Sequence, residues 1–235
     1  MQDPNSSPIS WSARCALLLC ISATSITAVD NAAWTDAGTK NGIALAFRDD
    51  PALALREVRA TADLPFPAKQ IFSLVCDLSQ YQAVVPGVQE ARLLGGEVPA
   101  DYEVYLRYAP RFMVVAARDV VLRVQSRAGH GAFGCQWSEL ADRIPERNGT
   151  VRMPLLRGTW TIEARDTANS RVVYQVAAKP GGRLPGWLVR RGSVNALAEV
   201  IEQVKRCLGR SITSNVEDMA RVQDDVSRVR RVMRS

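Results

Sequence analysis

The only histidine of the sequence, His130, is the residue best suited by type to acid–base chemistry near neutral pH. It stands between Gly129 and Gly131, and this glycine-rich segment predicts a turn. General acid–base catalysis needs a positioned group that titrates near neutrality, usually a histidine. A histidine in a turn between glycines is typical of the solvated surface. We therefore interpret His130 as a turn residue and expect no catalytic residue in this chain.

Three of the five cysteines, Cys76, Cys135 and Cys207, lie beyond the N-terminal apolar segment. Three is an odd number, and no C-x-x-C or cysteine–histidine spacing occurs, so the pattern does not favour a metal site or a disulfide framework. We interpret these cysteines as small buried hydrophobic residues. Neither a metal nor a cofactor is expected.

The chain is basic, with a formal net charge of +6 at pH 7. Such a charge can suit an anionic membrane surface or nucleic acid. The arginines are scattered, however, and the sequence contains no basic helix or aromatic–basic module. We interpret the charge mainly as solvated surface and expect no nucleic-acid partner.

The N-terminal segment has the features of an export signal. Arg14 precedes the apolar run CALLLCISATSITA, which ends at the small residue Ala28. A charge, an apolar run and a final small residue are typical of a secretory signal peptide, and the run is shorter than the roughly 20 residues that span a bilayer. Residues 1–28 are therefore predicted to direct the protein to the periplasm or to secretion. An uncleaved anchor is the alternative.

The elements that follow predict strands between an early and a late helix. Pro67 opens a helical pattern over 68–78. The late helix is predicted from apolar residues at helical steps, namely Trp187, Val194, Leu197, Ile201, Val204 and Leu208. Strands are predicted over 53–65, 88–95, 102–109, 118–126, 131–140, 151–165 and 171–179, and an amphipathic stretch over 34–47. Short connections favour antiparallel hairpins, so the whole is an α+β fold of six or seven strands.

The segment 210–235 changes character and is heavily charged. Apolar residues recur in it at helical steps, including Val216, Met219 and Val222. It is predicted to be a charged C-terminal tail, either an additional helix or a loosely ordered segment.

Several local motifs occur in a recognisable order. They are Trp34 with Gly42-Ile43, FPAKQIFSLVCDLSQY, Arg118-Asp119 leading RDVVLRV, VRMPLLRGTW and KPGGRLPGWLV. In this order they resemble the START family of steroidogenic-acute-regulatory-related lipid-transfer domains, and residues 29–209 are assigned to such a domain. The resemblance implies a helix-grip fold, in which a curved antiparallel sheet wraps a long C-terminal helix.

The resemblance also implies a site. One lipid of the sterol, fatty acyl or phospholipid class would occupy a tunnel between the sheet and the final helix, with this helix and adjacent loops as a lid hinged near Gly181-Gly182. Some members place a polar cavity arginine where this chain has Val124. The pocket is then either more apolar or anchored elsewhere, with Glu103, Tyr105 and Arg107 sharing one face of a neighbouring strand. The predicted ligand-binding residues are Tyr105, Arg107, Val120, Leu122, Val124, Trp187, Val194, Leu197 and Ile201. Arg118 and Asp119 are predicted to form a structural ion pair.

An enzyme is the alternative to a carrier, because related helix-grip domains include polyketide aromatases and cyclases. Tyr105, Tyr108, Tyr174 and Arg107 could orient a polyketide, although aromatic residues on strands are more often core. We expect a monomeric, non-enzymatic lipid carrier that contacts membrane surfaces transiently. A protein-interaction module in the C-terminal tail is a third hypothesis.

Overall fold

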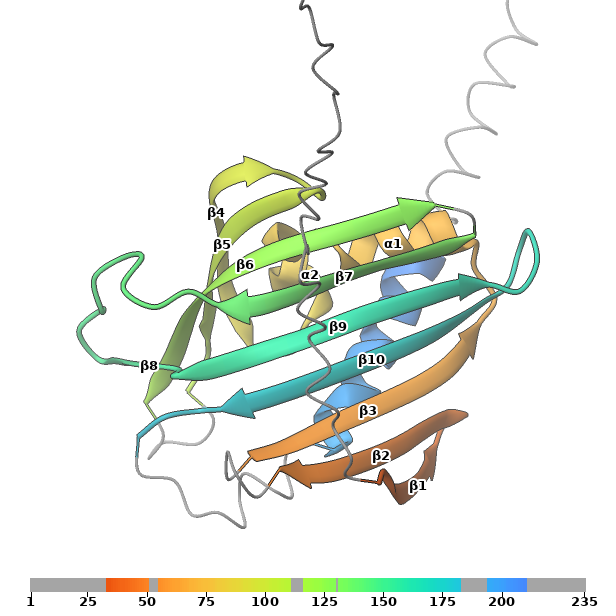
Figure 1. The fold of residues 1–235 in the computed structure, drawn as a ribbon, viewed down its shortest axis with the longest axis horizontal. Helices are drawn as coiled ribbons and strands as arrows, with labels where there is room; N and C mark the ends of the chain where they lie inside the picture. The colour runs from red at the N-terminus through yellow and green to blue at the C-terminus, as the bar shows by residue number, and fades with distance from the viewer. Residues whose placement is uncertain (1–32, 51–54, 111–115, 130, 183–193, 211–235) are drawn as a thin grey trace, which may run out of the picture. The chain divides into compact units, whose positions relative to one another are not determined.

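The computed structural model describes residues 33–50, 55–110, 116–129, 131–182 and 194–210. These residues belong to one unit, Ala32–Ser235, and form a large sheet with helices against one of its faces (Figure 1). The predictions for the signal peptide 1–28, His130, Trp187 and the segment 211–235 lie outside the described residues.

The described residues form ten strands and four helical segments. The strands are β1 (Thr35–Lys40), β2 (Ile43–Asp50), β3 (Leu55–Leu64), β4 (Val88–Glu97), β5 (Asp101–Tyr108), β6 (Ala117–Gly129), β7 (Ala132–Glu139), β8 (Thr150–Arg152), β9 (Leu155–Ala164) and β10 (Ser170–Lys179). The helical segments are α1 (Ala68–Val75), the 3₁₀ turn η1 (Leu78–Gln80), α2 (Tyr81–Val84) and a C-terminal helix that occupies residues 194–210.

The sheet runs in the order β1-β2-β3-β10-β9-β7-β6-β5-β4, and every neighbouring pair on this path is antiparallel. β8 is the exception, because it pairs in parallel with β6 at residues 117–119, beyond the point where β7 has ended. The predicted single strand 151–165 is therefore two strands. Pro154 lies at the break, and proline cannot donate to a ladder.

The amphipathic stretch predicted over 34–47 is a β-hairpin. Asn41 and Gly42 form its turn, and both have positive φ, 53° and 76°. A two-residue hairpin turn with positive φ at both positions is strongly favoured by Asn-Gly. The Asn41-Gly42 dipeptide is therefore the sequence signal for the hairpin of β1 and β2.

Alternating side chains give the sheet two distinct faces. We call the face that packs against the helices the inner face and the opposite one the outer face. Inner-face residues of the central strands are Tyr102, Val104, Leu106, Val120, Leu122, Val124, Cys135, Trp137, Trp160, Ile162, Val172 and Tyr174. They join one buried core with Leu197, Ala198, Val200, Ile201, Val204 and Leu208 of the C-terminal helix.

The first helix closes one half of the inner face. Pro67 precedes α1 as its N-cap residue, as the sequence predicts, and Ile71, Phe72 and Val75 are buried. α1 contacts β7 and β9, whereas η1 and α2 contact β4. In Figure 1, α1, α2 and the C-terminal helix lie on the same side of the sheet. None of the helices in the described residues is long and apolar enough to cross a membrane.

Candidate functional site

Five of the predicted ligand-binding residues meet between the sheet and the C-terminal helix. Val120, Leu122 and Val124 are at most 1% exposed and point from β6 to the inner face. Leu197 and Ile201 of the C-terminal helix belong to the same core. Val194 packs against this core from the start of the described part of the helix. These apolar residues make a surface that can bury an acyl chain or sterol.

The prediction that Tyr105 and Arg107 line the same space is wrong. Both lie on the outer face, because Tyr105 pairs with Val121 and Arg107 with Asp119, whereas Val120 and Leu122 point the other way. The Tyr105 hydroxyl lies 3.2 Å from Asp119 Oδ2. The Arg107 guanidinium instead pairs with a carboxylate on β4. The polar anchor proposed for the lipid is therefore not on this pair of residues.

A loop covers the outer face at this point. Glu90 of β4 accepts from both Arg107 (Nε–Oε2, 3.3 Å) and Arg147 (Nη1–Oε2, 3.0 Å). Two surface hollows lie along this loop. One, of 380 Å³, is lined by residues 139–146 and 152–154 and also by Val120 of the inner face. The other, of 340 Å³, is lined by residues 144, 145 and 147 together with Glu90, Arg92 and Tyr105. Their charged side chains include several that are already ion-paired. We interpret this region as a structural clamp on the sheet.

The predicted ion pair between Arg118 and Asp119 is also wrong. Adjacent strand residues point to opposite faces, so the two side chains cannot meet. Asp119 is 1% exposed and pairs with Arg152 of β8, whose Nε lies 2.8 Å from Asp119 Oδ1. Arg118 points to the inner face and donates through Nε to the Pro180 carbonyl oxygen at 3.4 Å and through Nη1 to that of Ala116.

Aromatic side chains form one wall of the inner face. The rings of Trp160 and Tyr174 stack with centroids 4.0 Å apart and an interplanar angle of 9°. Trp137 lies next to Tyr174, at a centroid distance of 6.1 Å. Gly158 makes room for Trp137, because a Cβ at this position would lie 2.4 Å from Trp137 Cζ2. This glycine is required by the close approach of the indole.

The hydroxyls of three of the five tyrosines have hydrogen-bond partners, and those of the other two do not. Tyr81 donates to the Val75 carbonyl oxygen (2.9 Å) and accepts from Trp160 Nε1 (3.0 Å). Tyr102 and Tyr105 also have partners. The hydroxyls of Tyr108 and Tyr174 have no hydrogen-bond partner among the residues that the structure describes. Among the described residues, no fully buried side-chain oxygen lacks a partner, so these two hydroxyls are not fully enclosed and are candidates to bind a ligand.

Burial also decides the protonation of these two groups. It raises the pKa of Tyr108, and it raises the pKa of Tyr174 together with the nearby charge that Tyr108 would carry. Both hydroxyls therefore stay protonated at neutral pH and can donate or accept a hydrogen bond. Phenols of this kind are poor general bases, which need a pKa near the working pH.

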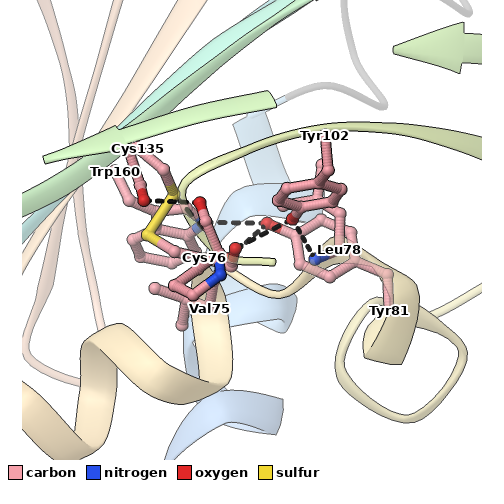
Figure 2. The surroundings of a disulfide bond; sticks show 9 residues. Val75, Cys76, Leu78, Tyr81, Tyr102, Cys135 and Trp160 are labelled. Carbon is pink, nitrogen blue, oxygen red and sulfur yellow. Dashed lines mark hydrogen bonds between the residues drawn. A yellow bond between two sulfur atoms is a disulfide. The ribbon is translucent and has the colours of Figure 1, made fainter. Parts of the chain in front are cut away.

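A disulfide joins the end of α1 to β7, which corrects the prediction that Cys76 and Cys135 are separate buried thiols. Their Cα atoms are 5.7 Å apart and 59 residues apart in sequence. Figure 2 shows the bond beside the hydrogen bonds of Tyr81 and Tyr102, which hold the backbone of residues 75–78. An odd count of cysteines hid this pair, because Cys207 lies outside it. Among the described residues, no group of three potential metal ligands is present.

The comparisons with known proteins agree with this architecture. A family model described as polyketide cyclase / dehydrase and lipid transport matches residues 64–205. The structure of a fragment of the STAR-related lipid transfer protein from Xanthomonas axonopodis is 28% identical, with a TM-score of 0.67, and the match covers 74% of this chain and 98% of that one.

Two curated proteins match over shorter segments. An uncharacterized protein of Pseudomonas aeruginosa is 34% identical over 83 residues, and the phosphatidylcholine transfer protein of Mus musculus is 29% identical over 68 residues. These segments are 35% and 28% of this chain, and they span only 41% and 32% of the two relatives.

The sheet, its inner face and the packed C-terminal helix define a helix-grip domain of the START type. The chain belongs to the polyketide cyclase / dehydrase and lipid transport family, whose model covers more than half of it. The family resemblance and the fold predicted from the sequence are thereby confirmed. Such a fold supports lipid binding in general.

Proposed function

We propose that the protein binds one lipid between the inner face of the sheet and the C-terminal helix, and carries it without changing it chemically. The observation that carries this proposal is the composition of that face. It combines apolar side chains and an aromatic wall with two tyrosines, Tyr108 and Tyr174, whose hydroxyls no described residue engages. A few polar groups among mostly apolar side chains are typical of small-molecule sites.

The relatives support a carrier. The Xanthomonas axonopodis protein and the mouse protein are both lipid transfer proteins by name. The inner face adds a chemical reason, since burial raises the pKa of its tyrosines Tyr108 and Tyr174, and Arg118 stays charged. Neither type of group exchanges protons readily near neutral pH. The same face also carries one carboxylate, Glu139, which accepts from the Leu156 backbone N–H at 3.3 Å. A polyketide cyclase remains the alternative function within this family.

Native mass spectrometry of the purified protein tests the proposal. We expect a one-to-one complex whose added mass is released intact by denaturation and is identified as a lipid after extraction. Incubation with lipids and with polyketide-like compounds should give stoichiometric binding and unchanged compounds. A product that forms with turnover, and that disappears in Tyr174→Phe, would transfer the assignment to the cyclases.

We further propose that the C-terminal helix and its preceding loop act as the lid. The C-terminal part of the helix is attached to α2, because Gln203 Nε2 donates to the Ala83 carbonyl oxygen at 3.0 Å. The N-terminal part of the helix comes after Gly181 and Gly182 in the sequence, and both glycines have φ of 68°. Gly181 packs against the Arg152 carbonyl, so this turn is itself well defined. The lid would therefore move in the part of the helix that precedes Gln203.

Export is a separate proposal, supported by the N-terminal apolar run and by the disulfide. Disulfides persist in oxidising compartments and are rare in the cytosol. We propose that the mature protein begins near Val29, outside the cytoplasm. N-terminal sequencing of the cell-fractionated protein tests this, and a cytoplasmic chain that retains Met1 would contradict it.

A further inference from the structure

Arg118 is a buried cation on the lipid side of the sheet. It is 9% exposed and shares the inner face with Val120, since both lie at even positions of β6. Its cross-strand partner on β5 is Tyr108, one of the two tyrosines whose hydroxyl has no partner. The guanidinium and this hydroxyl therefore belong to the same end of the inner face.

No carboxylate neutralises Arg118 among the residues that the structure describes. Its Nε and Nη1 donate only to backbone carbonyls, and its Nη2 has no acceptor there. In the part of the chain that the structure describes, no fully buried side-chain nitrogen or oxygen lacks a partner, so Nη2 is not fully enclosed. Other shielded arginines behave differently. Arg152, for example, pairs with Asp119 and Arg48 with Glu57.

A guanidinium stays charged under all conditions in which proteins fold, and burying a charge without a counterion is costly. The adjoining parts of the chain do not offer a counterion by sequence. Residues 183–193, which follow Gly182, contain three arginines and neither aspartate nor glutamate, and residues 111–115, which precede β6, contain one arginine and no acid. Gly182 itself lies beside the guanidinium, since a Cβ there would be 3.6 Å from Arg118 Nη2.

We propose that Arg118 binds the anionic headgroup of the carried lipid, a carboxylate or a phosphate, with Tyr108 as a second donor. This inference rests on the proposed lipid-binding function and names the class of its ligand. Arg118 stands at the end of the apolar stripe Val120, Leu122 and Val124, so a headgroup at Arg118 places its acyl chain along that stripe. Charge-assisted hydrogen bonds from a guanidinium fork suit both oxyanions.

Two matched pairs of ligands test this inference. Oleic acid is compared with oleyl alcohol, and dioleoyl phosphatidic acid with dioleoylglycerol, so that each pair differs only in the headgroup. The wild-type protein should bind the anionic member of at least one pair about 10- to 100-fold more tightly, which is the usual effect of a hydrogen bond to a charged group. The pair that shows the larger preference distinguishes a carboxylate from a phosphate.

The variant Arg118→Gln should lose this preference and retain the affinity for the neutral member. Arg118→Lys, which keeps the charge but loses the fork, should retain part of the preference. Arg123→Gln is the matched control, because Arg123 lies on the outer face of the same strand and pairs with Asp101 at 2.7 Å. This control should leave both affinities unchanged.

The outcomes separate the two proposals. Binding of no lipid at all would overturn the proposed function. Binding of lipids without a preference for anions in the wild-type protein would overturn only the role of Arg118. An absence of preference is also expected if an acidic residue of the segment 211–235 neutralises Arg118. A preference for the anionic ligand that survives in folded Arg118→Gln would also overturn the role of Arg118. If that variant does not fold, the comparison of the matched ligands on the wild-type protein still tests whether the site prefers an anionic headgroup.

Discussion

Tyr81 of α2 and Tyr174 of the inner face differ in what their hydroxyls do. Tyr81 links α2 to the sheet through Trp160 and to α1 through the Val75 carbonyl, whereas no described residue engages the hydroxyl of Tyr174. Tyr81→Phe should therefore lower the free energy of unfolding by about 1–3 kcal/mol, because it leaves buried groups without a partner. Tyr174→Phe should change it by less than about 0.5 kcal/mol.

Denaturant unfolding of both variants measures this difference, and lipid binding provides the complementary readout. Tyr174→Phe should weaken the binding of a lipid that has a polar group and leave stability intact. A loss of stability in Tyr174→Phe as large as in Tyr81→Phe would show that Tyr174 is only a core residue.

At the level of single residues, the sequence predicts which side chains of one strand share a face, but not which face of the sheet a neighbouring strand's side chains occupy. The alternation of Val120, Leu122 and Val124 correctly placed them on one apolar face. The face of Tyr105 and Arg107 could not be derived in the same way, because it depends on the register between β5 and β6. Tyr105 pairs with Val121, and a register shifted by one residue would have reversed the result.

At the scale of elements, the disulfide fixes α1 against the sheet. The variant Cys76→Ala/Cys135→Ala should be less stable by about 2–4 kcal/mol, because the bond closes a long loop in the unfolded chain. Cys207→Ala is the control, since Cys207 lies outside the bond. Thermal unfolding with and without a reducing agent measures the effect. Equal stability of the double variant and the wild type would mean that the bond does not form in the protein.

The C-terminal helix is the element expected to gate lipid exchange. A disulfide engineered from position 197 to a facing strand should block lipid exchange, and reduction should restore it, because the N-terminal part of the helix has to move. A tether at the anchored end, from Cys207 to a cysteine at Ala83, is the control. Cys207 Sγ already lies 3.7 Å from the Ala83 carbonyl oxygen, so this tether should leave exchange unchanged. Unaltered exchange in the verified oxidised protein with the first tether would exclude gating by this helix.

Some elements could be predicted from the sequence and others could not. The apolar periodicity predicts α1 and the C-terminal helix, because packing against one sheet face demands that pattern. β8 has three residues and pairs in parallel with a strand distant in sequence, and no local pattern encodes such a partner. The pairing of Cys76 with Cys135 likewise depends on the packing of α1 on β7.

At the scale of the whole molecule, the burial of the tyrosines predicts its behaviour in alkali. Burial raises the pKa of all five, Tyr81, Tyr102, Tyr105, Tyr108 and Tyr174. In the unfolded chain tyrosine titrates near pH 10, so above this pH the unfolded state releases protons that the folded state retains. Stability is therefore complete below about pH 10 and falls as the pH rises further.

Ultraviolet absorbance of phenolate, recorded together with circular dichroism, measures this behaviour. The phenolate signal should appear in the same cooperative transition as the loss of structure, and it should appear near pH 10 in denaturant. A fraction of tyrosines that titrates near pH 10 in the folded protein would contradict the burial of those residues.

In the proposed function, one lipid lies between the inner face and the C-terminal helix. Photo-crosslinking with a fatty acid that carries a diazirine at the middle of its chain tests it most directly, with the modified residues identified by mass spectrometry. We predict saturable labelling of inner-face residues such as Leu122, Val124 and Trp137, together with Leu197 or Ile201 of the helix. Labelling concentrated on the outer face, at Tyr105 or Arg107, or labelling that unlabelled lipid does not compete away, would contradict the account.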